Sequence, residues 1–166
     1  MIIVRTESSG DADAIYAVHA ASFPAEGEAR LVDALRAGGR LSVSLVAELD
    51  GAVIGHVAFS PVTTGDGVEG VGLGPIAVVE GERERGIGAR LVEEGVAACR
   101  VAGFGWAVVL GDPAYYGRFG FRAAREFGLS DEYRGGDAFQ ALELIEGSLP
   151  RGAGLVRYAP EFAELE

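Results

Sequence analysis

Lysine and asparagine are absent from this chain of 166 residues, and cysteine, methionine and tryptophan each occur once. Without lysine the chain cannot form a P-loop, whose Gly-x-x-x-x-Gly-Lys-Ser/Thr motif places that side chain on the phosphates. All fourteen basic residues are therefore arginines. The single cysteine, Cys99, excludes a disulfide within the chain and fits a reducing compartment.

Long apolar runs are also missing, since the longest extend for roughly ten residues and contain glycines, too few to span a bilayer. The first residues, Met1 to Arg5, have no basic stretch followed by a long apolar segment, so we expect no signal peptide and a cytoplasmic protein. The formal net charge of −11 opposes attraction to nucleic acids and to anionic membranes. Neither is an expected partner.

The length and an apolar content of 49% predict one domain, residues 1–166, with a buried core. The Asp50-Gly51 pair predicts a tight hairpin turn. Hydrophobic periodicity predicts helices over 11–23, 26–37, 86–100 and 113–119. It predicts strands over 2–5, 41–49, 52–62, 72–79, 104–110, 121–125 and 139–145, and a last edge strand over 155–158. This order predicts a mixed α/β sheet.

The most informative segment joins the apolar run Gly72–Val79 to the helix that begins near Gly86. It reads Arg83-Glu84-Arg85-Gly86-Ile87-Gly88. The first amides of a helix lack an internal acceptor and carry partial positive charge. Glycines allow an anion to approach that backbone closely, so the segment predicts a cradle for a pyrophosphate. A dinucleotide fingerprint would need a third glycine where Leu91 stands.

The pattern Arg83-x-x-Gly86-x-Gly88 resembles the acyl-CoA site of the GNAT superfamily of N-acetyltransferases. A second segment, Asp112 to Phe121, contains Tyr-x-x-x-Gly-Phe, which is similar to the second signature of that superfamily. The two segments lie about 30 residues apart, which leaves room for one helix and one strand. The resemblance covers roughly residues 2–146 and is greatest to a small bacterial, largely uncharacterised branch.

The resemblance implies the GNAT fold, with a central, mostly antiparallel sheet, a splayed strand pair and flanking helices. It implies acetyl-CoA as co-substrate, and no metal is expected because no Cys/His/carboxylate cluster has ligand spacing. The pantetheine arm would pair with the backbone near Ile76 and Val78. The residues expected to bind the cofactor are Ile76, Ala77, Val78, Arg83, Glu84, Arg85, Gly86, Ile87, Gly88, Ala89, Tyr115 and Phe119.

Tyr116 matches the general acid of the family, because a phenol can protonate the departing thiolate. The general base is open, since Gly72 stands where protein-acetylating members carry a glutamate. His56 has a suitable intrinsic pKa, although a hydrogen-bonded structural histidine fits its strand equally well. Glu28 is the other main candidate, and its alternative role is to complement a helix dipole.

Other polar residues have simpler interpretations. Glu69 and Asp112 are further candidates for the base, and a chain of waters could replace any side chain. Cys99 is interpreted as buried packing in the middle of a helix, and His19 as an ordinary helix residue. Arg118 is interpreted as a solvated helix residue, with contact to the CoA 3′-phosphate as its alternative role.

The expected function is transfer of the acetyl group of acetyl-CoA to a primary amine of a small molecule, within a ternary complex. A protein amine is an alternative acceptor, because the acidic charge suits a basic partner. A non-catalytic acyl-CoA-binding sensor is the alternative of a different class. The chain could be a monomer or a homodimer, and the segment 155–165 could cover a strand edge or form a dimer contact.

Overall fold

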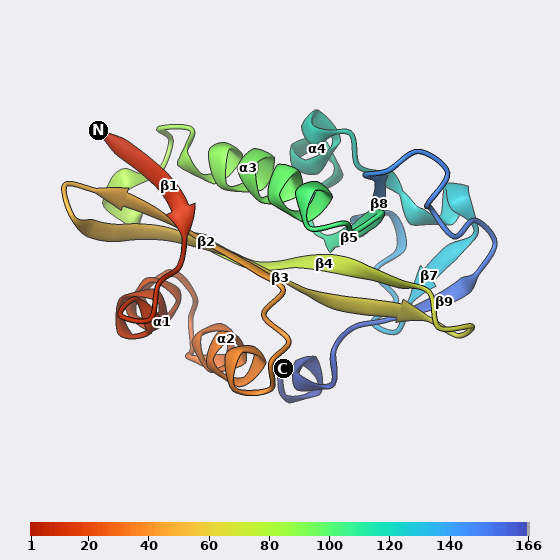
Figure 1. The fold of residues 1–166 in the computed structure, drawn as a ribbon, viewed down its shortest axis with the longest axis horizontal. Coiled ribbons are helices and arrows are strands. Elements are labelled where there is room, and N and C mark those ends of the chain that lie inside the picture. The colour runs from red at the N-terminus through yellow and green to blue at the C-terminus, as the bar shows by residue number, and fades with distance from the viewer. Residues whose placement is uncertain (166) are drawn as a thin grey trace. The chain divides into compact units, whose positions relative to one another are not determined.

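The structure is a computed structural model that describes residues 1–165. Apart from the unpredicted β7, helices and strands follow one another in the order that the sequence predicts (Figure 1). In chain order they are β1 (Ile2–Thr6), α1 (Ala12–Ser22), α2 (Gly27–Ala37), β2 (Val43–Leu49), β3 (Ala52–Thr64), β4 (Glu69–Val78), α3 (Ile87–Val101), β5 (Trp106–Leu110), α4 (Pro113–Tyr116), β6 (Arg122–Ala123), β7 (Leu129–Asp131), β8 (Phe139–Glu143) and β9 (Gly154–Arg157). Short 3₁₀ helices are η1 (Glu80–Glu82), η2 (Gly117–Phe119), η3 (Ala124–Phe127), η4 (Gly136–Ala138) and η5 (Pro160–Glu164). Among the described residues, no helix is both long and apolar enough to cross a membrane.

The nine strands form one mixed, mostly antiparallel sheet in the order β1-β2-β3-β4-β5-β8-β6, and β9 pairs with both β3 and β7. The β1–β2, β2–β3, β5–β8 and β6–β8 pairs are antiparallel. The β4–β5 pair is parallel, and its register runs from Val71–Ala107 to Leu73–Val109. β4 itself continues to Val78, beyond the last of these pairs. The mixed α/β sheet predicted from the sequence is confirmed.

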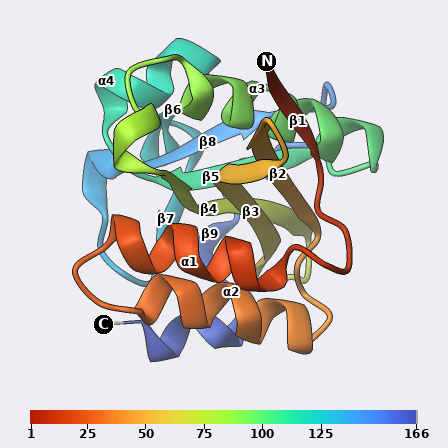
Figure 2. The same ribbon diagram turned by 90° about the vertical axis from the view of Figure 1, so that its left-hand side faces the viewer.

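The chain folds into two compact units, and the first contains Met1–Phe59, Pro75–Gly95 and the segment from Pro160 onward. Side chains alternate along a strand, so β3 presents two different faces. On one face, Ala58 belongs to a buried cluster that includes Ile15 of α1 and Val32 of α2. On the other, a Cβ at Gly55 would lie 3.2 Å from Leu91 of α3. Figure 2 shows α1 and α2 on the side of these strands opposite to the start of α3.

The second unit contains Ser60–Gly74 and Val96–Ala159. β5 lies at its centre, where Trp106 is 1% exposed. The indole ring of Trp106 packs directly on the backbone of β4, because a Cβ at Gly70 would lie only 2.5 Å from it. Arg100, near the end of α3, donates from Nε to the carbonyl oxygen of Leu144 at 2.9 Å. The Trp106 ring leaves no space for a side chain at Gly70.

Most boundaries predicted from the sequence are confirmed within two residues. The turn between β2 and β3 has φ of 50° at Asp50 and 85° at Gly51, the left-handed values that an Asp-Gly hairpin turn requires. Some details differ from the prediction: β4 starts at Glu69 rather than at 72, and the helix predicted over 113–119 is α4 followed by η2. The strand predicted over 121–125 is reduced to β6 and continues as η3, and the three-residue β7 was not predicted.

The prediction that residues 155–158 form an edge strand is wrong, because β9 has a neighbour on each side. It pairs antiparallel with β3 through Thr63–Arg157 and Thr64–Val156, and parallel with β7. A strand of three residues such as β7 is too short to show periodicity in the sequence. The sequence therefore contained no sign that β9 has β7 as a second partner.

Candidate active site

The predicted anion cradle lies in the first unit, between the end of β4 and the start of α3. The connection passes through η1 and turns twice through left-handed backbone, with φ of 66° at Glu84 and 76° at Gly86. Its entry is fixed, because the amide of Val79 donates to the carbonyl oxygen of Ile54 at 2.9 Å. The guanidinium of Arg83 donates from Nε to the carbonyl oxygen of Val78, also at 2.9 Å. The loop is therefore anchored to the sheet at its start.

The helix that follows, α3, packs on the core through its buried face. Ile87 is 2% exposed and Leu91 is fully buried, so the first turns of α3 pack on the core. The amide of Arg90 donates to the carbonyl oxygen of Gly86 at 3.1 Å and closes the first turn. The preceding amides have no acceptor inside the helix. Space beside the loop is open, since a Cβ at Gly86 would meet nothing within 4 Å. The arrangement can hold an anion against backbone amides.

The arginines near this loop differ in how their charges are balanced. Arg85 forms an ion pair with Glu82, three residues earlier. Arg90 pairs with Glu94 at 3.1 Å and also donates to the carbonyl oxygen of Ile2. Arg83 donates to the neutral Val78 carbonyl instead, so among these three its positive charge is the least compensated. Arg83 is thus the side chain best suited to attract a phosphate.

Tyr116 lies in the second unit, at the end of α4. Asp112 begins this helix by accepting a hydrogen bond from the amide of Ala114 at 3.0 Å. The Tyr116 ring packs on the backbone of Gly111 and meets Phe121 edge-on, with centroids 5.9 Å apart. Tyr116 is 8% exposed, and burial raises the pKa of its hydroxyl to about 12. The phenol therefore stays protonated at neutral pH and can act as a proton donor.

Two aromatic residues surround Tyr116 within the same short segment. Tyr115 meets it edge-on at 5.0 Å between centroids, and Phe119 lies 6.3 Å away. The guanidinium of Arg118 lies 4.4 Å from the centroid of the Tyr115 ring, a cation–π arrangement. Arg118 also donates to the carbonyl oxygen of Tyr115 at 3.3 Å. The exposed Arg118 thus stabilises the turn that contains Tyr115 through these two contacts.

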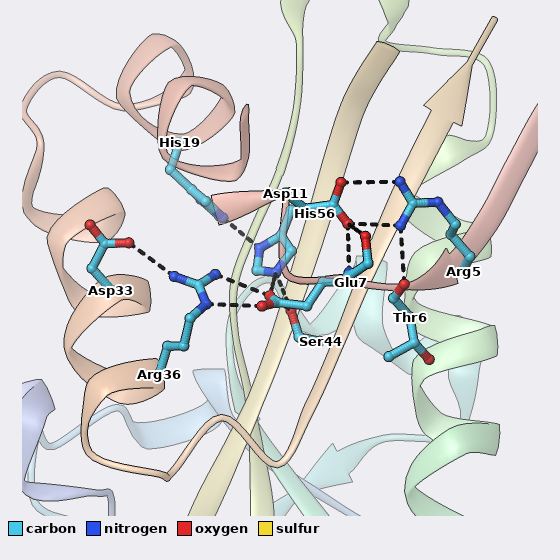
Figure 3. A network of polar contacts seen from close by, with 10 residues as sticks. Arg5, Thr6, Glu7, Asp11, His19, Asp33, Arg36, Ser44 and His56 are labelled. Atoms are coloured by element: carbon cyan, nitrogen blue, oxygen red, sulfur yellow. Dashed lines mark hydrogen bonds and ion pairs between the residues drawn. The ribbon is translucent and has the colours of Figure 1, made fainter. Parts of the chain in front are cut away.

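The two candidate bases are both in the first unit and have different surroundings. His56, on β3, is fully buried, and both of its ring nitrogens are occupied (Figure 3). Nδ1 lies 2.8 Å from Nε2 of His19, and Nε2 lies 2.7 Å from Oγ of Ser44. Burial lowers the pKa of His56 well below its ordinary value. Glu28 lies half-buried in the first turn of α2, where its charge complements the helix dipole.

Comparison with known proteins identifies the family. The sequence model of the Acetyltransferase (GNAT) family matches residues 12–121, which is more than half of the chain. The chain belongs to the GNAT family of N-acetyltransferases. The predicted resemblance and the predicted fold are confirmed.

Individual GNAT relatives cover nearly the whole chain. The "Uncharacterized N-acetyltransferase YhbS" of Escherichia coli K12 is 42% identical over 164 residues, which are 97% of this chain and 98% of the relative. The crystal structure of Escherichia coli YhbS in complex with CoA superposes with a TM-score of 0.93 at 41% identity, over 98% of this chain and 92% of that one. A GNAT acetyltransferase from Brucella melitensis, in complex with acetyl-CoA, gives 0.82 at 39% identity over 98% of each chain.

Gly72, the position where the family resemblance implies a glutamate in protein-acetylating members, is tightly packed within the second unit. A Cβ at Gly72 would lie 2.9 Å from the ring of Tyr158 and 3.0 Å from a methyl of Val62. Tyr158 is 9% exposed and cannot swing away easily. The aromatic ring fills the space that a glutamate side chain would need.

One residue of interest was missed from the sequence alone: His19, interpreted above as an ordinary helix residue, is fully buried. The burial of His19 could have been predicted from the helix pattern, because Ile15, Val18 and His19 follow the i, i+3, i+4 spacing of a core-facing stripe. Its contact with His56 was not readable, since 36 residues separate the two along the chain. In the described residues, no group of three His, Cys, Asp or Glu side chains gathers as a metal site would need.

Proposed function

We propose that the chain transfers the acetyl group of acetyl-CoA to a primary amine of a small molecule by direct attack in a ternary complex. The observation that carries the proposal is the anchored loop from Glu80 to Gly86, with its left-handed residues and the start of α3 beyond it. The first amides of a helix have no acceptor inside it. The CoA complex of the YhbS relative and the acetyl-CoA complex of the Brucella relative support the same ligand.

Holding the co-substrate is assigned to backbone rather than to side chains. The amides from Arg83 to Ala89 would bind the pyrophosphate, with Arg83 supplying charge. The backbone of β4 at Ile76 and Val78 extends past the last β4–β5 pair, at Leu73, and can offer amides and carbonyls to the pantetheine arm. Amides in that position would also polarise the thioester carbonyl.

The chemistry needs one proton donor and one proton acceptor. The amine nitrogen forms a bond to the carbonyl carbon, the carbon–sulfur bond breaks, and the departing thiolate takes a proton. We assign that proton to Tyr116, whose hydroxyl is kept protonated by burial. The amine loses a proton in the same sequence. His56 and Glu28 are the two side-chain candidates for the acceptor of that proton.

The test is to follow release of free thiol from acetyl-CoA with a broad panel of primary amines, using purified protein. Tyr116→Phe should lower turnover at least tenfold without a comparable rise in the Michaelis constant for acetyl-CoA, because the ring stays and the proton is lost. Tyr115→Phe is the matched control and should retain most activity. Unchanged turnover in Tyr116→Phe would remove Tyr116 from the mechanism.

Two observations favour a second candidate function, a non-catalytic acyl-CoA sensor. The space of the family glutamate is filled by Tyr158, and both ring nitrogens of His56 are engaged. Such a sensor would bind acetyl-CoA but release no thiol with any amine in the panel. A lysine-containing basic peptide in the panel also tests the protein-amine alternative, which the charge of −11 would suit.

A further inference from the structure

A chain of polar side chains runs through the core of the first unit. It starts at Glu7, which follows β1, and passes through Ser44 on β2 and His56 on β3 to His19 on α1 (Figure 3). Both histidines are fully buried, and Ser44 is 5% exposed. Three elements, α1, β2 and β3, and the residue that follows β1 thus contribute to one continuous row of hydrogen bonds.

The outer end of this row carries a negative charge. Arg36 of α2 donates two hydrogen bonds to the Glu7 carboxylate, from Nε to Oε2 at 2.9 Å and from Nη2 to Oε1 at 3.0 Å. A fork of this kind binds the ionised carboxylate. The side chain of Glu7 is 17% exposed, so this end of the row is accessible to solvent.

The carboxylate fixes the direction of every bond in the row. A carboxylate only accepts, so the hydroxyl of Ser44 donates to Glu7. Oγ of Ser44 then accepts from Nε2–H of His56. A neutral imidazole has one N–H, so Nδ1 of His56 is an acceptor and receives Nε2–H of His19. Nδ1 of His19 is left as a bare lone pair.

That last nitrogen distinguishes the row from an ordinary structural network. Nδ1 of His19 is buried and has no hydrogen-bond partner among the described residues. Buried polar atoms are nearly always paired, so an orphan needs an explanation. The Phe23 ring stacks on His19 with centroids 6.1 Å apart and is only half-buried, at the start of the connection from α1 to α2. The row therefore ends on a base that lies beneath a partly exposed aromatic ring.

We propose that Nδ1 of His19 receives the proton released by the acceptor amine, and that His56 and Ser44 pass a proton on to Glu7. This inference rests on the acetyl transfer proposed above. One proton enters at Nδ1 of His19 and one arrives on the Glu7 carboxylate. Each imidazole exchanges one N–H for the other, and Ser44 keeps a hydroxyl. Glu7 then releases the proton to solvent and the tautomers reset.

The surroundings suit passage of a proton rather than its storage. Burial lowers the pKa of His19 to about 4, and that of His56 in the same direction, so both rings are neutral at pH 7. The positive charge of Arg36 further disfavours a proton resting on His56, and Asp11 opposes this effect. Asp11 is itself held by Arg5 at 2.7 Å, and Asp33 pairs with Arg36 at 3.0 Å. Arg36, Asp11 and their partners thus bring charges of both signs close to the row.

The experiment removes the hydroxyl of Ser44, which interrupts the row of hydrogen bonds and leaves both histidines in place. In Ser44→Ala, we expect turnover at neutral pH to fall at least tenfold, while the affinity for CoA and the Michaelis constant for acetyl-CoA stay unchanged. Ser44→Thr keeps a hydroxyl and should recover most of the turnover. The matched control is Asp33→Asn, which removes the outer partner of Arg36 and should leave turnover within twofold. The pH–rate plateau should disappear in Ser44→Ala, since proton removal then depends on hydroxide.

A second measurement does not need activity. Nitrogen-15 NMR of the histidine rings in the wild-type protein should show a proton on Nε2 and a bare Nδ1 in both. A proton on Nδ1 of either ring, or wild-type turnover with an intact plateau in folded Ser44→Ala, would overturn the relay. Failure of the wild-type protein to bind CoA would instead refute the proposed function, and the tautomers would still decide whether the row has the inferred direction.

Discussion

Gly72→Ala should destabilise the protein although it adds only one methyl group. The added Cβ would lie 2.9 Å from a ring carbon of Tyr158 and 3.0 Å from a methyl of Val62, about half an ångström inside ordinary contact. Both neighbours are nearly fully buried, and an aromatic ring cannot yield by a rotamer change of its tip. Overpacking of this kind typically costs about 1–3 kcal/mol, and we expect a loss in that range.

The assay is urea unfolding followed by circular dichroism, which gives the free energy of unfolding from the linear extrapolation. Gly65→Ala is the control, because a Cβ there meets nothing within 4 Å, and it should change the free energy by less than about 1 kcal/mol. In a Tyr158→Ala background the Gly72→Ala penalty should shrink by about 1 kcal/mol or more. A wild-type midpoint for Gly72→Ala, or an equal penalty in both backgrounds, would refute this account of Gly72.

The same geometry predicts that Gly72→Glu will not supply a general base. The added side chain would clash with Tyr158, and its carboxylate would be buried. An increased amine-acetylation rate in folded Gly72→Glu would contradict this. The free energy of unfolding should fall as the pH drops from about 6.5 toward about 4, by roughly 3 kcal/mol from His19 alone. In this range His19 is protonated in the unfolded chain, whereas the buried ring, with its pKa near 4, stays neutral in the folded protein. Urea midpoints at several pH values test it, and His19→Leu should flatten the slope. Glu84→Gly should stabilise the folded protein by about 1 kcal/mol, since it relieves the left-handed backbone at that residue (φ 66°). It should also bind CoA roughly threefold more tightly, because it removes a negative charge beside the phosphate cradle. Calorimetric titration measures it, with Glu146→Gln as the control that should not change affinity.

Local sequence signals were sufficient for the loop between β4 and α3. Gly86 and Gly88 mark the turn and the helix start, and the structure has the helix beginning at Ile87. The Asp-Gly turn likewise predicted the β2–β3 hairpin. In each case neighbouring residues determine the backbone conformation, so the pattern is visible in a short stretch of sequence.

Features that depend on long-range register were not predictable. Ser44 reaches His56 because β2 and β3 pair with Val46 opposite His56, which places Ser44 diagonally across on the same face. Nothing in the two stretches specifies that register by itself. The packing of Tyr158 over Gly72 is similar, since it depends on β9 pairing with β3, and a short strand near the end of the chain carries little pattern.

The most direct test of the central claim, that the loop before α3 binds acyl-CoA, is calorimetric titration of the protein with acetyl-CoA. ATP and NAD serve as control ligands, and the titration is repeated on a Gly86→Glu/Gly88→Glu variant whose fold is verified by circular dichroism. The account predicts selective binding of acetyl-CoA by the wild-type protein and loss of that binding in the variant. Absence of binding by folded wild-type protein, or unchanged binding by the folded variant, would contradict it.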